Sequence, residues 1–258
     1  MLRPTTPLRS HSDARFGARA LFAGLALLIV AVPFGLLLFL VEDRWSPLSK
    51  DDSGARDELH TLALQHDVLV TALKALSTVG SALVYVPLFA AVAAWLAWRR
   101  LPRLALFVVV TVAGSAALNA LVKLAVDRAR PVVANPIAHA SGMSFPSGHA
   151  QSATVAASVL LLVFLPALRG AWRPAAVALA ITFVIAVGFA RVALGVHFVS
   201  DVLAGYALGA AWVAAMIAAF NALRQDRGDP PTDPARGLEP QHVSRLALDA
   251  ELERDPAA

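Results

Sequence analysis

Long uncharged runs dominate the pattern of hydrophobic and polar positions along this chain. The runs are Ala20–Val41, Ala75–Trp98, Leu104–Val122, Ala150–Leu168, Pro174–Ala190 and Val202–Leu223. Each is about as long as the ~17–25 residues that a membrane-spanning helix needs. An open strand of this composition would leave backbone groups without partners in lipid. The pattern therefore predicts an all-α fold, a six-transmembrane-helix bundle in one domain.

Composition agrees with a membrane protein and narrows the choice of partners. The chain is 58% hydrophobic and only 16% charged, whereas soluble domains carry roughly 25% charged residues. A net charge of +4 could indicate nucleic acid, but the arginines lie at helix ends rather than in one patch, so no nucleic-acid partner is expected. Because the sequence contains no cysteine, disulfides and thiolate-bound metals are excluded.

The distribution of Lys and Arg among the short loops predicts the orientation in the membrane. Basic residues gather in the N-terminal arm, in the second loop and in the fourth loop, whereas the first loop, residues 42–74, is rich in Asp and Glu. Both termini are therefore expected in the cytoplasm of a cell with a bacterial-type plasma membrane. The first run has no A-x-A-like cleavage site and is interpreted as an uncleaved signal anchor.

Shifts in composition divide the chain into three parts. Residues 1–16 are interpreted as a disordered cytoplasmic arm and residues 17–223 as the six-helix membrane domain. Residues 224–258 are rich in Pro and charge and are interpreted as a disordered cytoplasmic tail. Apolar positions among polar ones over residues 56–74 predict a helix that lies at the outer interface.

The informative polar residues lie at the ends of the apolar runs. In an antiparallel bundle, the C-terminal ends of the third and fifth runs and the N-terminal ends of the fourth and sixth share one face. On that outer face we expect Lys123, Arg130, Ser147, Gly148, His149, Arg191, His197 and Asp201. Asp127 and Arg128 are interpreted as a solvated helix end with a local ion pair. Asn119 and Ser115 are expected to form hydrogen bonds between helices.

Spacing suggests how two pairs of these residues act together. Lys123 and Arg130 are seven residues apart, about two helical turns. We therefore expect them on one side of a helix that Pro131 ends. His197 and Asp201 are four residues apart, so the carboxylate can hydrogen-bond the imidazole across one turn.

A helix start and three cations together predict an oxyanion site. Ser147 and Gly148 come just before a helix, whose first N–H groups point outward and favour an anion. Arginine adds a planar two-pronged contact to phosphate, and lysine adds a point charge. Around two histidines, these groups predict binding of a phosphate-like oxyanion.

Three motifs in the sequence carry a resemblance to a known family. They are Lys123-x6-Arg130-Pro131, then Pro146-Ser147-Gly148-His149, then Arg191-x5-His197-x3-Asp201. They resemble the three-part signature of the type 2 phosphatidic acid phosphatase family, whose superfamily also includes bacterial acid phosphatases and vanadium haloperoxidases. The likeness departs from the family at Ala190, where serine is usual.

The resemblance implies a role for each residue. His197 would attack phosphorus to form a phosphohistidine, and Asp201 would hold the proton on its other ring nitrogen. His149 would protonate the leaving oxygen and then activate water. The residues that would hold the phosphate oxygens are Lys123, Arg130, Ser147, Gly148 and Arg191. Because these cations would take the place of Mg²⁺ in kinases, neither a metal nor another cofactor is expected.

These expectations favour a membrane phosphatase acting on a lipid phosphate or diphosphate at the extracytoplasmic face. Undecaprenyl diphosphate is the first choice of substrate, and phosphatidate or phosphatidylglycerophosphate is the second. The alternatives are a phosphotransferase with an alcohol acceptor, a vanadate-binding haloperoxidase, and a non-catalytic six-helix protein or transporter. Transporters often show broken helices and inverted repeats, whereas here the ionisable groups gather on one surface.

Overall fold

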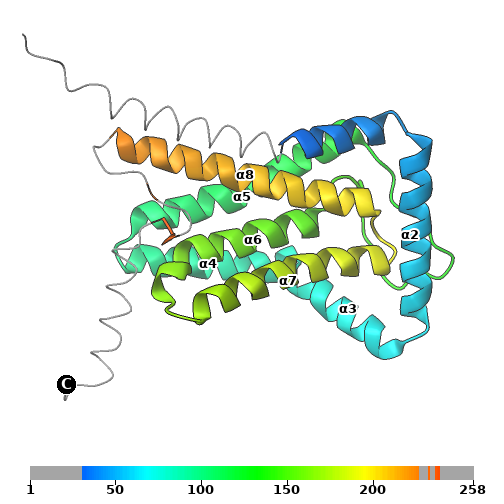
Figure 1. Ribbon diagram of the computed structural model, residues 1–258, viewed down its shortest axis with the longest axis horizontal. Coiled ribbons are helices and arrows are strands. Elements are labelled where there is room, and N and C mark those ends of the chain that lie inside the picture. The colour runs from blue at the N-terminus through cyan, green and yellow to red at the C-terminus, as the bar shows by residue number, and fades with distance from the viewer. Residues whose placement is uncertain (1–30, 227–231, 233–235, 239–258) are drawn as a thin grey trace, which may run out of the picture.

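The computed structural model describes residues 31–226, 232 and 236–238, and every regular element in these residues is a helix (Figure 1). The helices are Ala31–Glu42, α2 (Ser46–Leu64), α3 (Asp67–Val79), α4 (Ala82–Trp98), α5 (Pro102–Val126), α6 (Gly148–Phe164), the short 3-10 helix η1 (Leu165–Ala167), α7 (Trp172–Ala193) and α8 (Val199–Gln225). The predicted all-α fold is confirmed. The arm 1–16 and most of the tail 224–258 lie outside the described residues.

Four of these helices, α5 to α8, are long and apolar enough to cross a membrane. A fifth span is added if α3 and α4 count as one span that bends by 40°. The predicted run Ala75–Trp98 is therefore divided, because Gly80 and Ser81 interrupt it between the two helices. Of the run Ala20–Val41, only residues 31–41 are described. The protein is a multi-pass membrane protein, whereas six spans and the orientation of the termini stay predictions.

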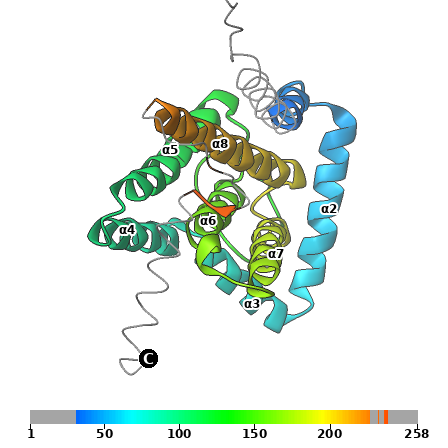
Figure 2. The same ribbon diagram turned by 60° about the vertical axis from the view of Figure 1, so that its left-hand side comes forward.

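Helix α6 lies at the centre of the bundle, with α5, α7 and α8 packed around it (Figure 2). Lipid provides no hydrophobic drive for helix association, so small residues that allow close approach become important. Gly205 and Gly209 of α8 have the GxxxG spacing and lie against α6. A Cβ at Gly205 would lie 2.6 Å from the Ser147 carbonyl oxygen. The missing side chain therefore lets the start of α8 approach the start of α6.

Polar side chains also join the helices inside the bundle. Asn119 Nδ2 of α5 donates to Gln151 Oε1 of α6 at 2.6 Å. Gln151 Nε2 in turn donates to Ser115 Oγ at 2.8 Å. The predicted interhelical hydrogen bonds of Asn119 and Ser115 are confirmed, and they hold the first turns of α6 against the C-terminal half of α5.

Helix α2 lies across the end of the bundle at which α7 ends and α8 begins (Figure 1). The prediction of one helix over residues 56–74 is wrong, because the extended backbone of His66 separates α2 from α3. The buried imidazole of His60 lies 3.0 Å from the Ala193 carbonyl oxygen and 2.9 Å from the Asn135 carbonyl oxygen. Helix α2 is thus joined both to α7 and to the loop that follows α5.

Candidate functional site

The ends of four helices meet beneath α2 and carry the polar residues that the sequence singled out. Lys123 lies in the last turn of α5 and Arg191 in the last turn of α7. His149 lies in the first turn of α6 and Asp201 in the first turn of α8. Electrostatic interactions link Lys123 to both Arg191 and Asp201, and His149 to Arg191. The antiparallel order of the helices therefore brings these residues together.

Arg130 reaches the site by a different route from the predicted one. Helix α5 ends before Asp127, whose φ of 48° turns the chain away from the helix axis. The prediction that Lys123 and Arg130 share one side of a helix is therefore wrong. Instead, the loop after α5 folds back, and the guanidinium of Arg130 donates to the carbonyl oxygens of Val196 at 2.8 Å and Gly142 at 2.9 Å.

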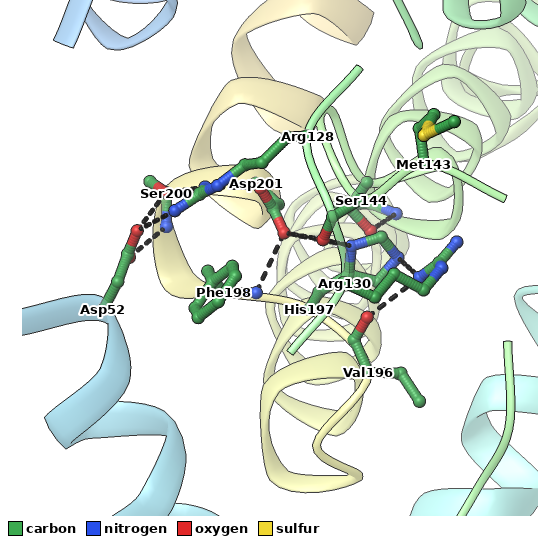
Figure 3. A network of polar contacts seen from close by, with 12 residues as sticks. Asp52, Arg128, Arg130, Met143, Ser144, Val196, His197, Phe198, Ser200 and Asp201 are labelled. Atoms are coloured by element: carbon green, nitrogen blue, oxygen red, sulfur yellow. Dashed lines mark hydrogen bonds and ion pairs between the residues drawn. The ribbon is translucent and has the colours of Figure 1, made fainter. Parts of the chain in front are cut away.

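The hydrogen bonds around His197 define its tautomer (Figure 3). Arg130 Nη1 lies 3.0 Å from His197 Nε2, and because a guanidinium only donates, Nε2 is the unprotonated nitrogen. The proton is then on Nδ1, which lies 3.3 Å from Asp201 Oδ2. The carboxylate therefore orients the ring, although His197 itself comes just before α8 rather than within it.

The surroundings of His197 also keep its imidazole neutral. Burial lowers the pKa of His197 to about 4, and the positive charges of Arg130 and Arg191 act in the same direction. The hydrogen bond and negative charge of Asp201 oppose this shift. At neutral pH the ring therefore has a free lone pair on Nε2, on the side where Arg130 lies.

The carboxylate of Asp201 is fully buried and receives hydrogen bonds from several segments of the chain. Besides His197, its partners are Ser144 Oγ, the Phe198 N–H at 2.9 Å and Arg128 Nη1 at 2.7 Å. A buried charge is strongly destabilising unless it is paired and hydrogen-bonded. These partners meet that requirement and hold the carboxylate in one orientation.

Arg128 is a member of this network, and the prediction that it belongs to a solvated helix end is wrong. Its side chain is only 17% exposed and bridges Asp201 to Asp52 of α2, which lies 2.9 Å from Nη2 (Figure 3). Asp52 also accepts hydrogen bonds from the backbone and hydroxyl of Ser200. The guanidinium lies over the Phe198 ring, 4.3 Å from its centroid.

Sequence reasoning missed Asp52 and Ser200 and misread Arg128. Asp52 is one of several acids in the first loop, and nothing in its local pattern separates it from its neighbour Asp51. Arg128 did carry a signal, because it lies two residues before Arg130 in a loop where basic residues are scarce under the predicted orientation.

Lys123 supports the loop that carries Arg128 and Arg130. Its Nζ donates to the Met143 carbonyl oxygen at 2.6 Å and approaches the Ser144 carbonyl oxygen at 3.5 Å. The ammonium thereby holds the far end of this loop against α5. The backbone N–H of Ser144 also donates to the carbonyl oxygen of Arg128 at 2.8 Å, which closes the loop on itself.

Helix α3 contributes a further residue that the sequence did not single out. Ser77 Oγ accepts a hydrogen bond from Arg191 Nη1, and the Ser77 backbone hydrogen-bonds His149. Arg191 is only 6% exposed, and its Nε is buried without a hydrogen-bond partner among the described residues. Such an unsatisfied cationic donor is costly unless an anion binds beside it.

Ser147 and Gly148 form the N-terminus of α6, as the sequence predicted. The Ser147 hydroxyl accepts a hydrogen bond from the Ala150 N–H at 3.4 Å and so caps the helix. The Ser147 N–H donates to the Asp201 carbonyl oxygen at 2.9 Å. Because Gly148 is the first helical residue, its own N–H belongs to the group of donors that a helix start leaves free.

The charges of this region sum to a positive site. Arg128 is balanced by two carboxylates, Asp52 and Asp201. We name Lys123, Arg130 and Arg191 the cation cluster. Within the described part of the chain, they donate only to carbonyl and hydroxyl oxygens or approach His197. Three cations beside a neutral imidazole and a helix N-terminus can bind a polyvalent oxyanion and present it to a nitrogen lone pair.

The ion pair between Asp52 and Arg128 generates a prediction about stability. Because Asp52 is buried and Arg128 is mostly buried, Asp52→Ala and Arg128→Met should each destabilise the protein by about 3–5 kcal/mol. The double variant should fall short of the sum by about 0.5–3 kcal/mol, since the second change removes a charge already left unpaired. Unfolding of the purified protein in detergent measures all three values. Asp51→Ala, on the exposed neighbour, is the control and should change little; additive losses would contradict the coupling.

Comparison with known proteins agrees with this geometry. Residues 104–225 match the PAP2 superfamily. Over 94 residues the chain is 42% identical to phosphatidylglycerophosphatase B of Bacillus subtilis (strain 168). This alignment covers 36% of this chain and 46% of that protein. Over 97 residues the chain is 36% identical to decaprenylphosphoryl-5-phosphoribose phosphatase of Mycobacterium tuberculosis (strain CDC 1551 / Oshkosh), covering 36% and 49%. The alignments thus span about half the length of these curated relatives.

The fold is also similar to a solved structure. The crystal structure of the first transmembrane PAP2 type phosphatidylglycerolphosphate phosphatase from Bacillus subtilis superposes with a TM-score of 0.65 at 25% sequence identity. The superposition covers 74% of this chain and 93% of that one. The matched residues 104–225 include the cation cluster, both histidines and Asp201. In sequence over residues 104–225 and in fold, the chain is therefore similar to the PAP2 superfamily.

Proposed function

We propose that this protein is an integral-membrane phosphatase that removes phosphate from the headgroup of a lipid. The observation that carries the proposal is the environment of His197. Its Nδ1–H faces the Asp201 carboxylate, and its Nε2 lone pair lies on the side of Arg130. A neutral imidazole that a carboxylate orients and that lies beside cations is the arrangement expected of an activated nucleophile.

In the first half of the proposed reaction, His197 Nε2 attacks phosphorus. A P–N bond forms as the P–O bond to the lipid breaks, and the product is a phosphohistidine. The departing alkoxide takes a proton from His149, which acts as the general acid. Its hydrogen bond to the Ser77 backbone holds the His149 ring near Arg191, beside the site of attack.

In the second half, the neutral His149 acts as a general base. It takes a proton from water as the oxygen attacks phosphorus, and the P–N bond breaks to release inorganic phosphate and restore His197. Asp201 stabilises the positive charge that His197 carries while phosphorus is attached to Nε2. Its hydrogen bonds from Arg128 and the Phe198 N–H keep this carboxylate ionised and in place throughout.

The cation cluster would hold the non-bridging phosphate oxygens, where negative charge accumulates in the transition state. The Ser147 hydroxyl and the Gly148 N–H would add donors from the start of α6. Lys123, Arg130 and Arg191 thereby supply the positive charge that a divalent ion supplies in kinases. They would also repel such an ion, so we propose a metal-independent reaction. Ala190, where the family usually has serine, is fully buried and adds no hydroxyl to this cluster.

The substrate is proposed to carry its phosphate on a membrane lipid. The names of both curated relatives describe a phosphatase for a lipid, phosphatidylglycerophosphate in one and decaprenylphosphoryl-5-phosphoribose in the other. These names favour a headgroup phosphate over the diphosphate of undecaprenyl diphosphate, the first choice from sequence. Phosphatidylglycerophosphate and phosphatidate are therefore now our preferred substrates.

We propose that the site faces the extracytoplasmic side. The support is the charge of the connecting segments. The acidic first loop includes α2, which covers the site, whereas the basic RRLPR loop and the loop with Arg169 and Arg173 lie at the other ends of the helices. A lipid could then present its phosphate at headgroup height without leaving the bilayer.

Phosphate release from purified protein tests the function. His197→Ala should lower turnover by at least about 10³-fold, because no other group can form the intermediate. His149→Ala should lower it by about 10²–10⁴-fold, and the exposed His66→Ala is the matched control. The substrates are phosphatidylglycerophosphate, phosphatidate and undecaprenyl diphosphate in detergent, each with EDTA present. Full turnover in His197→Ala would exclude His197 as the nucleophile. Loss of activity with EDTA would exclude a metal-independent reaction.

The pH dependence of kcat/KM tests the state of His197. Protonated His197 cannot attack, so activity is present above its pKa and is lost below it. The pKa of about 4 places this acid limb well below 6.5. Arg130→Gln removes a neighbouring positive charge, so its acid limb should move to higher pH. The same substrate is used throughout, so that its own ionisation affects all variants equally. The exposed Arg169→Gln is the control. An acid limb that does not move in Arg130→Gln would contradict its assignment to His197.

Cysteine labelling tests the orientation, because the natural chain has no cysteine. Ala134 is exposed in the loop after α5, and Ala171 is exposed at the opposite ends of the helices. In intact cells, an impermeant maleimide should label Ala134→Cys but not Ala171→Cys. In inverted membrane vesicles the pattern should reverse. Labelling of Ala171→Cys alone in intact cells would show that the site faces the cytoplasm.

A further inference from the structure

An apolar groove of about 510 Å³ runs down the side of the bundle between α4, α6 and α7. Its upper end is formed at the break between α3 and α4, by Val79 and Gly80. Small side chains leave the space open, with Ala153 and Ala157 on the α6 wall and Ala180 on the α7 wall. The volume lies within the range of small-molecule pockets, about 300–1,000 Å³.

The upper end of this groove lies about one helical turn from residues of the polar site. On α6, Ala153 lies one helical turn after His149 and on the same face. Directly after α3, Gly80 lies three residues beyond Ser77, which hydrogen-bonds Arg191. A group held at the cation cluster therefore has the start of the groove about one turn below it.

Gly80 lets the break between α3 and α4 lie close against α7. A Cβ at Gly80 would lie 3.0 Å from Val187 Cγ1, and Val187 is one turn before Arg191 on α7. The broken span thus brings its backbone into contact with α7 directly beneath Arg191. The break therefore separates two functions of this span. Before it, Ser77 accepts a hydrogen bond from Arg191; after it, α4 lines the apolar groove.

The groove is long enough to cross one half of a bilayer. Its lining residues on α6 extend from Ala153 to Phe164 and continue to Leu168, which at 1.5 Å per residue is about 20 Å. One leaflet contributes about 15 Å of the ~30 Å hydrocarbon core. A single acyl chain can therefore lie along the groove for its full depth, whereas a polyprenyl chain several times longer cannot be contained in it.

We propose that this groove is the binding site for one acyl chain of a diacyl lipid phosphate whose phosphate lies at the cation cluster. The proposal rests on the proposed function. Transfer of a chain from lipid into an apolar groove brings little hydrophobic gain, because lipid tails are as apolar as the protein. The groove acts instead by shape: it holds the chain straight beneath the headgroup and so positions phosphorus against His197.

Two substitutions that fill the groove from opposite walls test this proposal. Ala157→Phe on α6 and Ala180→Phe on α7 should each lower kcat/KM for dioleoyl phosphatidate by about tenfold or more, by analogy with steric discrimination in apolar pockets. The value for dihexanoyl phosphatidate should stay within twofold, because its chains are too short to reach the filled part. Ala178→Phe is the matched control, since Ala178 is exposed on α7 and does not line the groove.

The outcomes separate this proposal from the others. If both groove variants retain full activity on dioleoyl phosphatidate, bulk bilayer lipid fills the groove and the proposal is overturned. Equal losses on the long and short lipids would overturn it too, because they would reflect general damage.

A binding measurement keeps the test independent of turnover. Native mass spectrometry of His197→Ala protein should show bound dioleoyl phosphatidate, and adding either groove substitution should reduce the bound fraction at least threefold. Should the unmodified protein release no phosphate while the groove variants still lose binding, the proposed function fails and the acyl site stands. Unchanged binding in both groove variants would overturn the acyl site.

Discussion

The buried carboxylate of Asp201 is the group on which the rest of the site depends. It is fully removed from water, and a buried charge persists only when its partners surround it. Those partners come from the start of α8, the loop after α5 and, through Arg128 and Asp52, helix α2. Since each contact fixes one of these segments, the requirement of a single carboxylate links the loop, the bundle and the covering helix into one structure.

Close helix packing makes that arrangement possible. Gly205 lets α8 approach the Ser147 carbonyl oxygen, and the Ser147 N–H in turn donates to the Asp201 carbonyl oxygen. The phosphate-binding start of α6 and the carboxylate that orients His197 are therefore held against each other by backbone contacts. In a bilayer, small residues and hydrogen bonds drive helix association. The contact between the starts of α6 and α8 therefore both packs the two helices and positions the groups of the proposed site.

The two proposals assign different parts of a lipid to different physical interactions. Charge and hydrogen bonds at the helix ends would select the phosphate, and the shape of the groove would select the chain. Helices α6 and α7 contribute to both, because His149 lies one turn above Ala153 and Arg191 lies about two turns above Phe183, and both Ala153 and Phe183 line the groove. A substrate bound at both ends would have little freedom left at phosphorus, which is the condition for efficient attack by a fixed imidazole.

The sequence by itself determined the helical class, most of the spans and the meeting of Lys123, His149, Arg191 and Asp201, because apolar length defines a span and antiparallel order decides which ends share a face. It could not place Arg130, whose route depends on the left-handed turn at Asp127. Only the tertiary structure revealed Asp52, Ser77 and the role of Arg128, since each acts through partners far away in the chain. Local patterns encode where a helix ends; which distant side chain satisfies a buried charge is decided only when the segments pack.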